Sequence, residues 1–192
     1  NPKPDPRLKK LEKTVNQVLE DWKAPGCAIA IVEKQKVLFA GGFGYSDLES
    51  KTPVTSGTLF HIGSSTKAFT CALTGILADE KKLDLDKPAV NYLPGLRFSD
   101  PLLTLQVTPR DMMCHRTGLP RHDFAWYGAP EISRDSMVKK IMFFEKTAEL
   151  RTRFQYNNFM LMALGAMAGE LENGKPWEEQ VKERLFDPLG MT

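Results

Sequence analysis

Strand-like patterning is confined to one early part of this chain. "GCAIAIVE" (26–33) is a continuous run of small and β-branched apolar residues, and "VLFAGGFGYSD" (37–47) follows after the polar turn "KQK". This pattern predicts a hairpin of two strands that is buried on at least one face. From Ser64 onward the apolar residues recur at helical spacing and strand character largely disappears. The second part of the chain is therefore expected to be mostly helical.

Apolar residues at three- and four-residue steps predict helices on both sides of the hairpin. One covers 7–22, and a second begins at Gly63 or Ser64 and ends near Lys81 or Lys82. The predicted parts are 1–62, which holds the first helix and the hairpin, and 63–192, which is mostly helical. Further helices are expected over 108–120, with Thr108 as N-cap and Pro109 as first residue, and over 134–147, 159–174 and 177–186.

The composition is that of an ordinary globular protein, with 42% hydrophobic and 26% charged residues. The formal net charge is +2 and the charges are mixed along the chain, so neither nucleic acid nor an anionic membrane is expected as a partner. The longest apolar run, 159–169, is too short to span a bilayer and predicts a buried helix. The first ten residues lack a signal-like apolar segment, which fits an intracellular protein or a trimmed mature chain.

The cysteines and the glycine-rich stretch favour structural roles. Cysteines at positions 27, 71 and 114 are an odd number without short spacings, so neither a disulfide framework nor a zinc site is expected. We interpret them as small buried hydrophobic residues. Glycines at 41, 42 and 44 end a strand and lead into a turn-rich loop, where no helix is available to receive a phosphate.

Carboxylates and histidines likewise indicate no metal site. Asp84 and Asp86 lie beside Pro88, which favours turn and cap roles over an acid/base pair. The three histidines, at 61, 115 and 122, do not form a recognisable ligand pattern, and His115 is expected near the end of a short helix. We therefore expect no metal and no cofactor.

The stretch "HIGSSTKAFT" (61–70) contains the strongest candidates for catalytic residues. Ser64 and Lys67 are three residues apart and share one helical face, whereas Ser65 points away from Lys67. A serine hydroxyl becomes a useful nucleophile beside a base, and a lysine either serves as that base or acts as the cation that prepares one. The start of a helix also favours negative charge developing on an oxyanion. Ser65 and Thr66 are assigned capping or packing roles.

The motif S-x-x-K is weak alone, but its surroundings resemble the serine penicillin-recognising family. The resemblance rests on "FHIGSSTKAFT" (60–70), on "LTLQVTPRDMMCHRTGLP" (103–120) and on "YNN" (156–158), and it extends over nearly the whole chain from about residue 24. The family comprises class C β-lactamases, DD-peptidases of the penicillin-binding protein class and related serine esterases. It implies an α/β plus all-α, β-lactamase/transpeptidase-like fold and a small-molecule or peptide substrate.

The resemblance also implies roles for four residues. Ser64 matches the nucleophile that becomes acylated, Lys67 the lysine one turn later, and Tyr156 the tyrosine that acts as general base or proton relay. Asn158 matches the asparagine that hydrogen-bonds the lysine and the amide side chain of the substrate. A phenol with an ordinary pKa near 10 becomes a usable base only beside a cation, which agrees with these roles. Taken alone, Tyr156 and Asn158 would fit a helix start with an Asn cap.

One family feature is missing from these 192 residues. The family has a third motif, K-T-G or a variant, on a strand that forms the far wall of the cleft and supplies the second oxyanion N–H. We therefore expect an N-terminal fragment from which the C-terminal part of the antiparallel sheet is absent, with a bare hairpin edge and a bare apolar face on the first helix. A second chain or self-association would then complete the sheet, and the chain alone would be a poor catalyst.

The expected function is a serine hydrolase that forms an acyl-enzyme on Ser64 and cleaves a β-lactam, a D-alanyl peptide or a small ester. The alternatives are a catalytically silent relative used for binding or assembly, and an intracellular interaction module. An aromatic loop with Phe124, Trp126 and Tyr127 either lines the substrate side or packs ordinarily. By resemblance, a periplasmic or secreted location with the signal removed is favoured over the cytoplasm.

Overall fold

The computed structural model describes residues 5–127 and 131–191 and forms two compact units, Asn1–His61 and Ile62–Thr192. In the first unit the predicted hairpin is confirmed as antiparallel, with Gly26 opposite Gly44 and Glu33 opposite Lys36. A short third strand follows, in a segment that sequence analysis assigned to a turn-rich loop. The elements are α1 (Leu11–Trp22), β1 (Gly26–Glu33), β2 (Lys36–Asp47) and β3 (Thr52–Pro53), in the sheet order β1-β2-β3.

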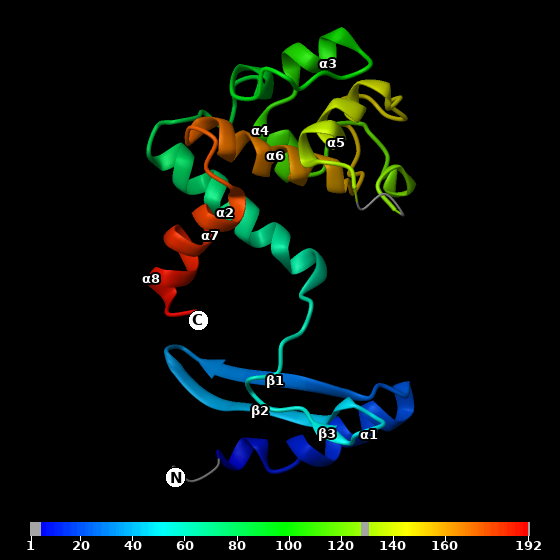
Figure 1. The fold of residues 1–192 in the computed structure, drawn as a ribbon, viewed down its shortest axis with the longest axis vertical. Helices are drawn as coiled ribbons and strands as arrows, with labels where there is room; N and C mark the ends of the chain where they lie inside the picture. Colours follow the sequence, from blue (N-terminus) through cyan, green and yellow to red (C-terminus); the bar gives the residue numbers. More distant parts are fainter. Residues whose placement is uncertain (1–4, 128–130, 192) are drawn as a thin grey trace. The chain divides into compact units, whose positions relative to one another are not determined.

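Helix α1 packs against β2 within this unit (Figure 1). Val15 on its apolar face is buried, whereas Trp22 is 82% exposed, as expected of an incompletely covered face. Gly42 shows why the strand is rich in glycine: a Cβ there would lie 2.2 Å from the carbonyl oxygen of Val54. The glycines therefore allow the chain after β3 to approach β2 closely.

The second unit is helical, as predicted, and its helices are shorter than the sequence pattern indicated. Asn157 rather than Asn158 caps α6, accepting a hydrogen bond from the N–H of Met160 at 3.2 Å. The main elements are α2 (Thr66–Asp79), α3 (Pro101–Gln106), α4 (Pro109–Met113), α5 (Arg134–Lys140), α6 (Asn158–Leu171), α7 (Trp177–Val181) and α8 (Asp187–Leu189), with short 3-10 turns at Gly63–Ser65, Ala89–Asn91, Asp123–Ala125 and Ile141–Phe143.

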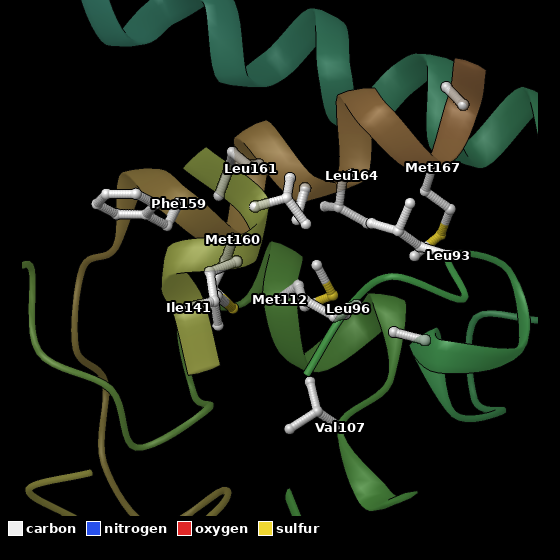
Figure 2. Packing of buried hydrophobic residues seen from close by; sticks show 14 of the residues in the cluster. Leu93, Leu96, Val107, Met112, Ile141, Phe159, Met160, Leu161, Leu164 and Met167 are labelled. Carbon is white, nitrogen blue, oxygen red and sulfur yellow. The ribbon is translucent and has the colours of Figure 1, made fainter. Parts of the chain in front are cut away.

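Helix α6 is the centre of the core in this unit, where it contacts α2, α4, α5 and α7. It is apolar almost all round, so it can be buried against several neighbours at once. Figure 2 shows Met160 of α6 beside Met112 of α4 and Ile141 after α5, and Met167 of α6 beside Leu93. This packing holds the beginning of α6 in a defined place, and the candidate site is built there.

Several boundaries differ from the expectation for physical reasons. The segment 101–106 forms α3, which was not foreseen; Asp100 caps it by accepting a hydrogen bond from the N–H of Leu102 at 2.9 Å. Helix α4 has the predicted cap, Thr108, but ends at Met113, well before Gly118. The last helix is interrupted by a π-helical turn, Lys182–Phe186, before α8.

The expectation of three buried cysteines is wrong, because Cys114 is exposed and Cys27 and Cys71 are only partly buried. All three are free thiols. Among the described residues, no helix has the length and apolar character needed to cross a membrane.

Candidate active site

Ser64 lies in the 3-10 turn that leads into α2, directly after Gly63, whose φ is +52°. The α-helix proper begins two residues after Ser64, slightly later than expected. Lys67 is in the first turn of α2 and its Nζ donates a hydrogen bond to Ser64 Oγ at 3.1 Å. Ser65 precedes the helix but makes no side-chain capping hydrogen bond. The local geometry therefore brings the lysine to Ser64, as the spacing predicts.

Tyr156 comes from a segment 92 residues away, and its hydroxyl lies 2.5 Å from Ser64 Oγ. Lys67 Nζ is 4.7 Å from the centroid of the phenol ring. Burial raises the pKa of Tyr156, but Lys67, the hydrogen bond with Ser64 and the charge of Arg121 together lower it below the usual value for a phenol. Ser64, Lys67 and Tyr156 thus form one connected cluster in which the phenol of Tyr156 loses its proton more readily than an ordinary phenol.

His115 helps to hold Tyr156 in this position, a role that sequence analysis did not foresee. Its imidazole packs against the phenol ring with centroids 4.6 Å apart. His115 Nδ1 accepts a hydrogen bond from the N–H of Asn157 at 3.1 Å, and its carbonyl oxygen accepts one from the N–H of Gln155 at 2.7 Å. Burial, and secondarily the charge of Lys67, lower the pKa of His115, so the neutral form that can accept at Nδ1 is favoured.

A buried carboxylate ties together the two segments that carry His115 and Tyr156. Asp111 is fully buried and accepts hydrogen bonds from Arg116 Nε at 2.7 Å and from Arg151 Nε at 3.0 Å. It also accepts hydrogen bonds from the backbone N–H and hydroxyl of Thr108. The main chain of the two arginines is joined as well, since the N–H of Arg151 donates to the carbonyl of Arg116 at 2.8 Å. The T-x-x-D spacing was the only sequence signal for this network.

Asn158 is the first residue of α6 rather than part of an extended loop. Its Nδ2 donates to Asp123 Oδ1 at 3.0 Å. The hydrogen bond to Lys67 that the resemblance implied is not among those made by the described residues. Asp123 in turn pairs with Arg121, whose Nη2 is 2.6 Å from Asp123 Oδ2. Sequence analysis missed both Arg121 and Asp123, because nothing in "RHD" marks them.

A cavity of about 610 Å³ opens beside Ser64 in the second unit. Trp126 and Tyr127 line it and stack on each other with centroids 4.3 Å apart, whereas Phe124 is 93% exposed and does not line it. The two aromatic residues therefore form part of the wall of the cavity beside Ser64. The remaining lining residues are Gly63, Lys67, Arg121, Ile132, Arg134, Met137, Asn158, Phe159 and Met162.

Asp84, Asp86 and His122, which were also considered in the sequence, make structural contacts. Asp84 Oδ1 accepts a hydrogen bond from the N–H of Asp86 at 2.9 Å, which is the predicted turn role. Asp86 itself pairs with Arg110. His122 stacks on Phe144 with centroids 4.3 Å apart. Within residues 5–127 and 131–191 no group of three His, Cys, Asp or Glu side chains is placed to hold a metal ion.

Comparison with known proteins assigns the fold. The computed structure is similar to the octameric penicillin-binding protein homologue from Pyrococcus abyssi, with a TM-score of 0.83 and 29% identity over 96% of this chain and 43% of that one. The expected β-lactamase/transpeptidase-like fold is thereby confirmed. Residues 11–192 match the family described as Beta-lactamase, so the chain belongs to the β-lactamase family.

Two curated relatives are enzymes by name. The chain is 32% identical to an unguisins hydrolase of Aspergillus campestris, over 97% of this chain and 36% of that protein. It is 28% identical to the teichoic acid D-alanine hydrolase of Staphylococcus aureus, over 96% of this chain and 43% of that protein. The chain thus spans well under half the length of these curated relatives.

Proposed function

We propose that this protein is a serine hydrolase that forms an acyl-enzyme on Ser64 and cleaves an amide or ester bond. The observation that carries the proposal is the position of Ser64 Oγ, 2.5 Å from the hydroxyl of Tyr156 and 3.1 Å from Nζ of Lys67. A nucleophile within hydrogen-bond reach of both a base and a cation is the arrangement that activates a hydroxyl. The hydrolases among the relatives support the same class of reaction.

In the proposed reaction Tyr156 is the general base. The phenolate takes the proton of the Ser64 hydroxyl while Oγ attacks the carbonyl carbon of the substrate. The phenol then returns the proton to the leaving nitrogen or oxygen as its bond to the carbonyl breaks, which leaves the acyl group on Ser64. Water hydrolyses this ester in a second step, again with proton transfer to Tyr156. Lys67 stabilises Tyr156 in its phenolate stages, because its ammonium lies beside the ring.

Asn158 is proposed to bind the substrate, since it lines the cavity next to Ser64. The aromatic wall of Trp126 and Tyr127 and the apolar side chains of Ile132 and Met137 suit an acyl group with an apolar part. The candidate substrates are a β-lactam, a D-alanyl peptide or ester, and a small ester. From the family resemblance we infer a periplasmic or secreted location.

The test is covalent labelling of the full-length protein by a fluorescent fluorophosphonate and a fluorescent penicillin, with mass spectrometry of the labelled peptide. Wild type should be labelled on Ser64, and Ser64→Ala should lose the label. Ser65→Ala is the matched control, because it removes the neighbouring hydroxyl and leaves the cluster intact. Equal labelling of wild type and Ser64→Ala would refute the proposed nucleophile. Absence of labelling together with no hydrolysis of nitrocefin, a nitrophenyl ester or a D-Ala-D-Ala peptide would favour a silent relative.

A further inference from the structure

The carboxylate of Asp123 links two groups that face Ser64 and the phenol ring of Tyr156. Asp123 Oδ2 accepts from Arg121 Nε at 2.7 Å, while Oδ1 accepts from Asn158 Nδ2 at 3.0 Å. The Asp123 side chain is only 17% exposed. Arg121 places its guanidinium carbon 4.8 Å from the ring centroid of Tyr156. The carboxylate of Asp123 therefore contacts both Arg121, which lies beside the ring of Tyr156, and Asn158, which lines the cavity next to Ser64.

The charge of Asp123 determines which way the Asn158 amide points. An ionised carboxylate can only accept hydrogen bonds, so the Asn158 atom that faces it must be the nitrogen. Burial raises the pKa of Asp123, but the hydrogen bonds from Arg121 and Asn158 outweigh this effect. The net result is a pKa below the ordinary value, so the carboxylate stays ionised at neutral pH. The amide oxygen of Asn158 is consequently the atom left to bind a donor in the cavity.

Arg121, which donates to the other oxygen of the Asp123 carboxylate, also lies beside Tyr156. The groups that face Tyr156 are Lys67 on α2, His115 after α4, and Arg121 in the loop before Asp123. A guanidinium near a phenol ring favours the phenolate by charge and by its contact with the π-system. Arg121 is 61% exposed and paired with Asp123, so its effect on Tyr156 is screened and smaller than that of a buried cation.

We infer that Asp123 is a positioning residue, which holds Asn158 with its amide oxygen toward the cavity and Arg121 beside the phenol ring of Tyr156. The inference rests on the proposed function. The family resemblance already implies that Asn158 contacts the amide side chain of a substrate; the consequence of the Asp123 role is the direction of that contact, with the amide N–H close to the scissile carbonyl, as in an N-acylamino acid ester or a peptide, as the donor. Such an N–H can donate to Asn158, and a substrate with CH₂ in its place leaves that oxygen unpaired.

The first test follows the rate of fluorophosphonate labelling of the full-length protein between about pH 6 and pH 10. In Arg121→Gln the midpoint of the rise in rate should move upward by about half to one pH unit, because the phenolate loses one nearby cation. Arg121→Lys should restore most of the shift. Arg110→Gln is the control, since it removes an arginine that pairs with an aspartate elsewhere. An Arg121→Gln profile that superposes on that of wild type would overturn this part of the inference.

The second test compares kcat/KM for an ester of N-benzoylglycine with the analogue that has CH₂ in place of the N–H. Wild type should prefer the N–H substrate, and Asp123→Ala should reduce this preference by about 5- to 10-fold, the worth of one hydrogen bond. Asp123→Asn should also lose much of it, because its single amide oxygen cannot accept from both Arg121 and Asn158. An unchanged preference in Asp123→Ala, with the variant folded by circular dichroism, would overturn the inference. Failure of the proposed function would be seen separately, as labelling that survives Ser64→Ala.

Discussion

Replacing Asp111 by Asn should cost far more stability than the same change at Asp86, although both carboxylates pair with arginines. Asp111 is fully buried, and Arg116 and Arg151 both donate to it. An amide of the same shape turns one acceptor into a donor that faces guanidinium groups. Removing one partner of a buried ion pair costs about 3–5 kcal/mol. Because Arg116 and Arg151 are 37% and 48% exposed and regain water, we expect a loss of about 2–3 kcal/mol.

The measurement is urea unfolding of the full-length protein, followed by circular dichroism. With a denaturant slope of about 1–3 kcal/mol per molar, a loss of about 2–3 kcal/mol should lower the urea midpoint of Asp111→Asn by about 0.7–3 M. Asp86→Asn should stay within error of wild type, because its carboxylate is 64% exposed. If the two variants lose similar stability, burial of the ion pair does not determine how much the pair contributes to the free energy of unfolding, and the reasoning fails.

The pH dependence gives an independent check on Asp111. Burial raises the pKa of its carboxyl, but hydrogen bonds from Arg151, Thr108 and Arg116 lower it below the ordinary value. A carboxyl with a lowered folded pKa stabilises the protein above its unfolded pKa, near 3.9, and loses that contribution as pH falls through the folded value. The gap between wild type and Asp111→Asn should therefore be constant from about pH 7 to pH 5 and shrink below about pH 4.

Two further predictions concern the segments around Tyr156. Gly118→Ala should destabilise the protein more than Gly174→Ala. Both glycines have φ above +80°, so the backbone strain is similar at the two positions. A Cβ at Gly118 would lie 2.2 Å from the carbonyl oxygen of Ala148, whereas a Cβ at Gly174 would meet no atom within 4 Å. Thermal unfolding measures the difference, and equal losses would contradict the clash. The pKa of His115 is lower in the folded protein than in the unfolded chain. Its contribution to the free energy of unfolding is therefore present above the unfolded pKa, near 6.5, and is lost as pH falls through the folded pKa. The urea midpoint should drop between about pH 7 and pH 5, less so in His115→Gln, and an equal drop in both proteins would exclude His115 as the cause.

Periodicity and turn residues predicted the hairpin, the main helices and the Thr108 cap because these depend on local sequence. Helix lengths were overestimated, since tertiary contacts decide where a pattern ends: 3-10 turns replace the expected α-helix at Gly63–Ser65 and after Lys140. The strand β3 was missed because two residues carry no recognisable alternation.

The candidate site was predictable only where residues are close in sequence or match a motif. The spacing of Ser64 and Lys67 is local, and Tyr156 and Asn158 came from a resemblance. Asp123 and His115 escaped because their contacts join segments 35 and 42 residues apart, and no pattern in a single sequence reports such pairings.

Helices α2 and α6 both begin at the candidate site. Ser64 stands just ahead of α2 and Tyr156 just ahead of α6, so the hydrogen bond between them joins the amino ends of two helices that also contact each other. The start of each helix carries a partial positive charge, and these two residues lie close to the two helix starts. The electrostatic surroundings of this hydrogen bond therefore depend in part on how α2 and α6 contact each other, and a core substitution that shifts one helix against the other is expected to change the acidity of the Tyr156 phenol.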